Sequence, residues 1–176
     1  MKELIEKAQA RDHFAFAALL ELYKQDLYKL ALAKLKNTFD VDDVIQETII
    51  SAYVKLPQLK DTSKFKMWLF KILINNCNMF YRKKKNIPTP FDDISSSLTS
   101  DETLFNRIDS RLNFYSILQP LTEKEKTIAI LYYASDCSIK EISKILKMNS
   151  NTVKTNLKRI REKLKEKLIK GENIYE

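Results

Sequence analysis

Lys and Arg side chains accumulate near the end of the chain, where their charges could bind a nucleic acid. Between Lys147 and Lys170 there are nine Lys or Arg residues and two Glu residues, a local net charge of +7. The whole chain has a formal net charge of +8 and a pI near 9.3. Such side chains hold DNA phosphates through charge and read base edges through hydrogen bonds. A solvated basic helix face would have a similar composition, so the elements that carry the charges matter.

Two short helices joined by a polar turn are predicted to position these side chains, over residues 136–168. Ser138 and Glu141 have the spacing of a capping box at the start of the first helix, and Asn149 or Ser150 can cap the second. Apolar residues recur every three or four positions along the second helix, at Val153, Leu157, Ile160, Leu164 and Leu168. This pattern is typical of a helix-turn-helix whose second helix enters the major groove of DNA.

Composition indicates an all-α protein of one domain or two small ones. Of 176 residues, 44% are hydrophobic and 31% are charged, and the only glycine is Gly171. Few Gly and Pro residues among abundant Leu, Ile, Lys and Glu favour helices. Glycine-rich phosphate loops and dinucleotide fingerprints are excluded, because each needs several glycines. We therefore expect no nucleotide-dependent catalysis by these routes and, more broadly, a protein that is not an enzyme.

The cysteine and histidine content argues against a metal site. Cys77 and Cys137 lie far apart and His13 is the only histidine, so there is no credible zinc-binding set. Both thiols are expected to be buried, in a reducing compartment. The start of the chain is charged, unlike a signal peptide, and no apolar stretch is long enough to span a membrane. We expect a cytoplasmic protein whose partner is a polyanion, either a nucleic acid or a membrane surface.

The first part of the chain is predicted to form four helices. A short one covers residues 2–10, Asp12 caps a long one that ends near Leu35, and Asp40 caps a third. The apolar residues of the third helix should face inward, which leaves its carboxylates and amides on an exposed acidic face.

A loop over residues 56–64 is predicted to precede the fourth helix, which Thr62 or Ser63 begins. This helix contains the stretch FKMWLFKILINNCNMFYRKKK, in which basic and aromatic residues are mixed. Such a mixture suits single-stranded nucleic acid, although most of the aromatic side chains are expected in the core.

Residues 87–104 are predicted as a flexible linker between two domains, residues 1–86 and 105–176. The segment contains two prolines, a serine run and no helical period. Beyond it, a helix is predicted over residues 103–118, and Thr122 with Glu125 forms a second capping box.

Three segments of the chain, taken in order, resemble the sigma-70 family of bacterial RNA polymerase sigma factors in its short, extracytoplasmic-function form. They are DVDDVIQETIISAY, FKMWLFKILINNCNMFYRKKK and LTEKEKTIAILYYASDCSIKEISKILKMNSNTVKTNLKRIREKL. The resemblance implies two helical domains, regions 2 and 4 of the family. It implies binding to core RNA polymerase, through its beta and beta-prime subunits, and to promoter DNA, where the factor begins strand opening. It also implies an anti-sigma factor as a partner, often membrane-bound, and neither a cofactor nor a small-molecule substrate.

For polymerase binding, the resemblance implies a helix that docks on a coiled coil of the largest polymerase subunit. The matching positions are Asp43, Val44, Gln46 and Glu47. A small acidic and amide-bearing patch suits a basic partner surface, where charge complementarity sets register and association rate.

For the promoter element about ten bases before the start site, here the proximal element, the resemblance implies capture of a flipped base, whose unstacking costs a few kcal/mol. The positions that match the capturing loop and helix are Leu59, Lys60, Asp61, Thr62, Ser63, Lys64 and Asn75. The phosphates of the same strand would be held by Arg82, Lys83 and Lys84.

For the element about thirty-five bases before the start site, here the distal element, the resemblance implies reading by the second helix of the helix-turn-helix. Base contacts match Lys154, Thr155, Lys158 and Arg159, and phosphate contacts are expected from Asn151 and Thr152. The glycines usual in this motif are replaced by Asp136, Lys147 and Asn151. A left-handed backbone at Lys147 would cost on the order of 1 kcal/mol.

Two alternatives stay open from the sequence. A stand-alone helix-turn-helix regulator that binds an operator would explain the second half of the chain, but would leave the acidic helix and the aromatic-basic helix without a task. A basic helical protein on an anionic membrane surface would need exposed apolar residues behind its basic face.

Overall fold

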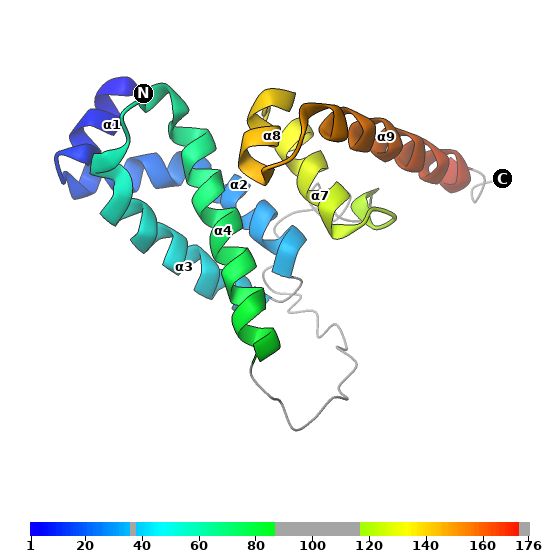
Figure 1. Cartoon of the computed structure of the whole chain (residues 1–176), viewed down its shortest axis with the longest axis horizontal. Helices are drawn as coiled ribbons and strands as arrows, with labels where there is room; N and C mark the ends of the chain where they lie inside the picture. The colour runs from blue at the N-terminus through cyan, green and yellow to red at the C-terminus, as the bar shows by residue number, and fades with distance from the viewer. Residues whose placement is uncertain (36–37, 87–116, 173–176) are drawn as a thin grey trace.

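The computed structural model describes residues 1–35, 38–86 and 117–172, and every regular element in these ranges is helical (Figure 1). The first part comprises α1 (Lys2–Gln9), α2 (His13–Leu35), α3 (Thr38–Lys55), the 3₁₀ turns η1 (Leu56–Gln58) and η2 (Thr62–Lys64), and α4 (Phe65–Asn86). The second part comprises α7 (Glu123–Ala129), the π-helical turn η3 (Ile130–Ala134), α8 (Ile139–Leu146) and α9 (Ser150–Glu172). The all-α prediction is confirmed. The predicted linker, and all but the end of the helix predicted over residues 103–118, lie outside the described residues.

Helix starts in the first part are only partly as predicted. Asp12 does precede α2, and its Oδ1 accepts a hydrogen bond from the Ala15 amide at 3.0 Å. The prediction that Asp40 caps the third helix is wrong, because α3 already begins at Thr38. The Asp40 carboxylate instead accepts a hydrogen bond from Lys84 Nζ at 2.9 Å, which joins the start of α3 to the end of α4.

Residues 56–64 are more ordered than the predicted loop, because they contain both 3₁₀ turns. Asp61 caps η2 by accepting a hydrogen bond from the Ser63 amide at 3.1 Å, and α4 follows directly from Phe65. The fourth helix therefore begins slightly later than predicted. Short 3₁₀ turns are common at the ends of α-helices, where they satisfy backbone groups that the helix leaves free.

Helix α4 packs against α2 and α3 through an apolar face and also contacts α8 in the second part of the chain (Figure 1). Its fully buried side chains are Leu69, Phe70, Leu73 and Cys77. One polar link is embedded in this packing. The amide of Asn76 donates to Thr48 Oγ1 at 3.1 Å, and Thr48 Oγ1 donates to the Val44 carbonyl at 2.7 Å. Thr48 is fully buried, and these two bonds satisfy its hydroxyl as an acceptor and as a donor where water cannot reach it.

Both predicted capping boxes are present in the second part. Thr122 and Glu125 bond reciprocally at the start of α7, as do Ser138 and Glu141 at the start of α8. Of the two candidates for the cap of α9, Asn149 is the one whose side chain accepts a hydrogen bond, from the Asn151 amide at 2.8 Å.

Glu125 has a second task besides capping α7. Its carboxylate is 7% exposed and accepts a hydrogen bond from Lys163 Nζ, on α9, at 2.8 Å. Burial alone would raise the pKa of Glu125, but the hydrogen bonds from Lys163 and Thr122 outweigh it, and the pKa is lowered. One carboxylate thus ties the start of α7 to the long helix that carries the cationic face.

The described residues show how the two cysteines are placed, and whether a helix could cross a membrane or a side-chain cluster could bind a metal. Cys77 and Cys137 are free and buried, and burial raises the pKa of each thiol to about 11. Within the described ranges, no helix is both long and apolar enough to cross a bilayer. The same ranges contain no group of three or more His, Cys, Asp or Glu side chains that could hold a metal ion.

The turn that lacks glycines does use a left-handed backbone. Lys147, in the turn after α8, has φ 53° and ψ 47°. Asp136, in the loop before α8, also has a positive φ, of 48°. Asn151, the third position where a glycine is usual, lies inside α9 and needs no such conformation. The cost predicted for a left-handed Lys147 therefore applies to this turn.

Replacing Lys147 with Gly should raise the free energy of unfolding by about 0.5–1 kcal/mol, because Gly adopts this backbone without a Cβ clash. The larger freedom of Gly in the unfolded chain offsets part of the gain. Urea denaturation followed by circular dichroism measures the difference. Lys144→Gly is the matched control, since Lys144 lies within α8, where Gly should cost about 1 kcal/mol. A Lys147→Gly chain that is no more stable than wild type would contradict the strain.

Candidate nucleic-acid interface

The outer face of α9 presents all six residues assigned to the distal element. These exposed residues are Asn151, Thr152, Lys154, Thr155, Lys158 and Arg159. The opposite face of the helix is buried through Val153, Leu157 and Ile160. The packing therefore fixes which side of α9 faces outward, as the predicted apolar stripe requires.

Few intramolecular contacts hold the cations of this face. Lys158 Nζ lies 3.9 Å from Glu162 Oε1, and both side chains are more than half exposed. Such exposed pairs contribute only about 0–1 kcal/mol, so a phosphate or base could displace the carboxylate at little cost. Thr155 is less free, because its hydroxyl donates to the Asn151 carbonyl at 3.0 Å.

The turn before α4 is built around two anchoring side chains. Gln9 Nε2, on α1, donates to the carbonyls of Leu56 at 3.1 Å and Leu59 at 2.7 Å. Asp61 accepts hydrogen bonds from Ser63 and Lys64, and these bonds lower the pKa of Asp61 to about 2. The Leu59 side chain is half-buried against the core.

Among the other residues assigned to this turn, Lys60, Ser63 and Lys64 are exposed and Thr62 is half-buried. The assigned positions therefore form one short surface. Lys60, Ser63 and Lys64 are its exposed members, whereas Leu59, Asp61 and Thr62 are half-buried.

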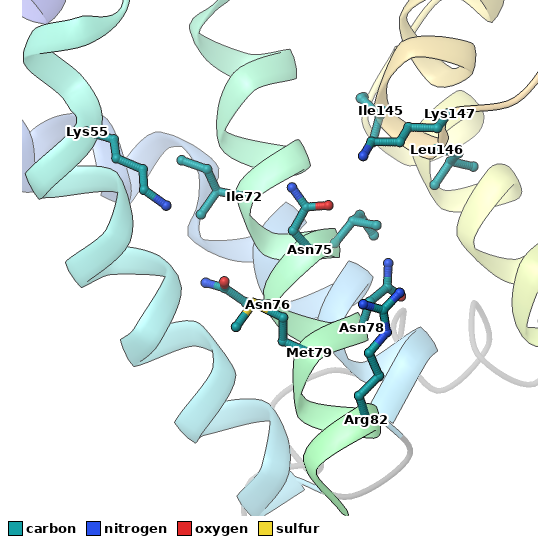
Figure 2. Close-up of a pocket in the computed structure, with 11 residues that line it drawn as sticks. Lys55, Ile72, Asn75, Asn76, Asn78, Met79, Arg82, Ile145, Leu146 and Lys147 are labelled. Carbon is teal, nitrogen blue, oxygen red and sulfur yellow. The ribbon is translucent and has the colours of Figure 1, made fainter. Parts of the chain in front are cut away.

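Two neighbouring asparagines on α4 have different environments. Asn76 is held by Thr48, whereas Asn75 is exposed and lines a cavity of about 500 Å³ between α4 and the end of α8 (Figure 2). Asn75 is the asparagine that was assigned to base capture. Its amide makes no hydrogen bond to another described side chain.

The basic end of α4 lies on the same helix. Arg82, Lys83 and Lys84 are exposed, and Arg82 also lines the cavity (Figure 2). Of the three, Lys84 is held by intramolecular contacts: it forms an ion pair with Asp40, and its Nζ lies 5.8 Å from the ring centroid of Phe80. The aromatic side chains are mostly core, as predicted: Phe65 and Phe70 are buried, and Trp68 and Phe80 are half-buried.

Two of the cationic residues that line the cavity were not assigned to it from the sequence. Lys55, at the end of α3, and Lys147, at the end of α8, share this lining with Asn75 (Figure 2). They come from parts of the chain that are far apart in sequence, so no local pattern could have grouped them.

The acidic face of α3 consists of Asp43, Gln46 and Glu47, all exposed. Val44, which was assigned with them, is 3% exposed, so its side chain packs in the core and is not available to a partner. Its assignment to a contact surface is therefore corrected. The Val44 side chain packs in the core and so helps to hold α3 with its acidic face outward.

Two apolar residues complete this face of α3. Ile50 is 59% exposed and Val54 is 55% exposed, one and two turns beyond Glu47. Sequence reasoning did not include them. The available signal was that both lie outside the inward stripe of α3, since an apolar residue off the stripe of an amphipathic helix has no core to enter.

Known families and proteins are similar to this chain in sequence and in fold. The sigma-70 region 2 family matches residues 19–87, and the family described as sigma-70, region 4 matches residues 111–164. Together the two matches cover most of the chain.

Two relatives come from Bacillus subtilis. The chain is 30% identical over 182 aligned residues to the extracytoplasmic-function (ECF) RNA polymerase sigma factor SigW, covering 96% of each chain. It is 34% identical over 138 residues to the RNA polymerase sigma factor SigV, covering 78% of this chain and 81% of SigV.

Two solved structures have a similar fold. One is CnrH in complex with the cytosolic domain of CnrY, with a TM-score of 0.68 and 23% identity over 95% of this chain and 96% of CnrH. The other is the sigma factor RpoE of Bartonella quintana in complex with the anti-sigma factor NepR, with a TM-score of 0.65 and 24% identity over 87% of this chain and 96% of RpoE. The chain belongs to the sigma-70 family of RNA polymerase sigma factors, in its extracytoplasmic-function group.

Proposed function

We propose that this sigma factor binds core RNA polymerase through α3, captures the proximal promoter element through η2 and α4, and reads the distal element through α9. The observation that carries the proposal is the separation of three exposed polar surfaces on three helices, each backed by a buried apolar face. The acidic surface on α3 would face polymerase. The two cationic or amide-bearing surfaces, on α4 and α9, would face promoter DNA. The factor needs no catalytic site, cofactor or small-molecule substrate of its own for this work.

Polymerase binding is supported by the composition of the outer face of α3. Asp43, Gln46 and Glu47 offer charge and hydrogen bonds, and Ile50 and Val54 offer apolar area next to them. An apolar centre with a polar rim is the usual anatomy of a protein interface. The partner that fits is a basic surface of the polymerase, such as a coiled coil of its beta-prime subunit, with the beta subunit engaged elsewhere on the factor.

Capture of the proximal element is supported by the contrast between Asn75 and Asn76. Asn76 is used to hold α4 on α3, so Asn75 is the amide that is free to bond a flipped base. The turn before α4 is preorganised by Gln9 and Asp61, which lowers the ordering cost of binding. Arg82 and Lys83 then hold strand phosphates.

Reading of the distal element is supported by the arrangement of cations along α9. Lys154, Lys158 and Arg159 lie on one exposed face, where Lys or Arg can bond the O6 and N7 atoms of guanine. Asn151 and Thr152 lie at the start of the helix, where free backbone amides and the helix dipole attract a phosphate.

An anti-sigma factor is proposed as the regulatory partner, and the cytoplasm as the place of action. Both similar structures named above are complexes, one with the cytosolic domain of CnrY and one with the anti-sigma factor NepR. A membrane-bound anti-sigma factor would hold the chain at the inner face of the membrane until a signal releases it. The alternative of a stand-alone operator-binding regulator accounts for α9 but gives the exposed faces of α3 and α4 no partner.

Run-off transcription with purified core polymerase and a promoter library tests the proposal. We expect the chain to associate with core polymerase and to produce transcripts with defined start sites at a subset of promoters. A chain that binds DNA fragments but neither binds core polymerase nor produces transcripts would support the stand-alone regulator instead.

Asp43→Lys should weaken binding to core polymerase at least tenfold, because it places a cation against a basic partner surface. Asp43 is exposed and caps no helix, so the fold should be retained. Fluorescence anisotropy with labelled sigma factor measures the affinity. Glu21→Lys is the control, since it makes the same charge change on an exposed position of α2. Equal affinities for the two variants would remove Asp43 from the interface.

Lys158→Ala should reduce selection of the distal element by about 1–3 kcal/mol if the ammonium group bonds a base edge. Transcription from promoters that vary only in that element measures the effect. The matched control is Lys165→Ala, farther along the same helix on an exposed position. If the loss is instead equal for every sequence and only the salt dependence changes, Lys158 contacts a phosphate.

A further inference from the structure

The segment between α3 and α4 is tied to α1, a helix to which no binding residue is assigned (Figure 1). Gln9, the last residue of α1, is half-buried, and its Nε2 donates to the carbonyl oxygens of Leu56 at 3.1 Å and Leu59 at 2.7 Å. An amide nitrogen carries two hydrogens, so both bonds can form at once. Because Leu56 begins the 3₁₀ turn η1 and Leu59 follows it, one side chain holds both ends of this turn.

The carbonyl groups beyond α3 need donors from outside that helix, because the last four carbonyls of an α-helix have no partner within it. Helix α3 ends at Lys55, and Pro57, which has no backbone N–H to donate, follows within η1. Leu56 is fully buried, so water cannot replace a lost donor there. The Leu59 amide donates to the Leu56 carbonyl at 3.0 Å, and Gln9 supplies its second donor.

The corner between α1 and α2 makes a further bond to the end of α3. Arg11 Nη1 donates to the Tyr53 carbonyl at 3.1 Å, and the guanidinium carbon lies 4.9 Å from the centroid of the Tyr53 ring. Arg11 does so from a left-handed backbone with φ 70°, a conformation that is unfavourable for a residue with a Cβ. Such backbone strain persists where the surrounding contacts fix it. Gln9 and Arg11 together therefore hold three carbonyls, those of Tyr53, Leu56 and Leu59.

The bonds of Gln9 and those of Asp61 have different consequences for the turn before α4. Asp61 accepts hydrogen bonds from Ser63 and Lys64, so its bonds lie within the turn and give it a local shape. Gln9 instead joins Leu59 to an element 50 residues earlier in the chain. Apolar packing also anchors the segment, but apolar contacts are non-directional, and hydrogen bonds specify the finer position.

Position is what base capture requires of this turn. A flipped base has to meet both residues 59–64 and Asn75, which lies on α4 and follows the packing of that helix. A binding arrangement of this kind works only when its members are held within about 0.5 Å of the productive geometry. The amide of Gln9 is engaged by backbone carbonyls, so its loss would move the turn relative to Asn75 without removing a group assigned to DNA.

We propose that Gln9 is a positioning residue for capture of the proximal element. By holding the carbonyls of Leu56 and Leu59, it fixes the distance between the base-capturing turn and Asn75, and so sets how strongly the captured base contributes to promoter opening. Gln9 acts through the turn and does not contact DNA. The proposal rests on the proposed function, since it concerns the same proximal site.

Two substitutions at Gln9 remove the donor in different ways. Gln9→Met keeps the length of the side chain and a similar helix propensity. Gln9→Glu goes further, because it places a carboxylate against the two carbonyl oxygens that the amide now joins. Gln25→Met is the matched control, since Gln25 is exposed on α2 and is assigned to no interface. Circular dichroism compares the helical content of the four chains.

Base capture is measured with the polymerase-bound factor on a promoter selected from the run-off library. Each base of the non-template strand in the proximal element is replaced in turn by an abasic site, and the loss of open-complex formation is measured. The position with the largest loss in wild type identifies the captured base. Abasic substitution and Gln9→Met then form a double-mutant cycle, which isolates the coupling between this side chain and that base.

The abasic loss at the captured position should be about tenfold smaller in Gln9→Met than in wild type or Gln25→Met, and at least as much reduced in Gln9→Glu. Loss of one hydrogen bond in a partly buried site shifts an equilibrium by roughly that factor. Abasic losses at the other positions, selection of the distal element and affinity for core polymerase should be unchanged.

An abasic loss at the captured position that is the same in both Gln9 variants as in wild type would overturn the positioning role. A uniform decrease at every position in both variants, with weaker core binding or lower helical content, would make Gln9 a residue of general stability and would equally contradict the proposal. If wild type forms no open complex with core polymerase, the proposed function itself fails, and the positioning role fails with it.

Discussion

The packing of α4 is the constraint on which the rest of the structure depends. This helix must bury one apolar face against α2 and α3, and it also contacts α8 in the second part of the chain. Its burial fixes which residues remain outside, and these are the free amide of Asn75 and the basic residues at its end. Because the apolar residues dominate the free energy of folding, the position of the polar residues is a consequence of core packing.

Acidic and basic residues are used differently in this chain. Several carboxylates are engaged locally: Glu125 and Glu141 complete capping boxes, and Asp61 closes the turn before α4. Many Lys and Arg side chains of α4 and α9 instead extend into solvent. The net charge of +8 is therefore concentrated where a polyanion can reach it. The acidic face of α3 is the exception, and it is the surface assigned to a protein partner.

Local patterns predicted local structure well. The capping boxes at Thr122 and Ser138 follow from spacings of three and four residues, as does the part of the α9 stripe that is buried, at Val153, Leu157 and Ile160. Leu164 is half-buried, and the Leu168 side chain lies outside what the structure describes. The extent of α2 also follows from periodicity. The starts of α3 and α4 differ from prediction because the carboxylate of Asp40 is drawn to Lys84, a partner 44 residues away, and because 3₁₀ turns precede α4.

Contacts between distant parts of the chain account for what the sequence could not predict. Val44 matches a family contact position but also belongs to the inward apolar stripe of α3 that the sequence predicts, and the structure places it in the core. The pairing of Lys66 with Ser135 and the cavity shared by Lys55, Asn75 and Lys147 join residues whose spacing has no local meaning. The family resemblance supplied roles for residues, whereas their exposure had to come from the structure.

The hydrogen bond between Asn76 and Thr48 has a mechanical consequence. It joins α4 to α3 at mid-length, and sliding of one helix along the other would cost the Thr48 hydroxyl the donor that Asn76 supplies inside the core. This bond and the apolar packing around it join the face of α3 proposed for polymerase to the face of α4 proposed for the unpaired strand. If α3 binds polymerase and Asn75 binds a base, as proposed, the orientation of α3 on polymerase would then also set the position of Asn75.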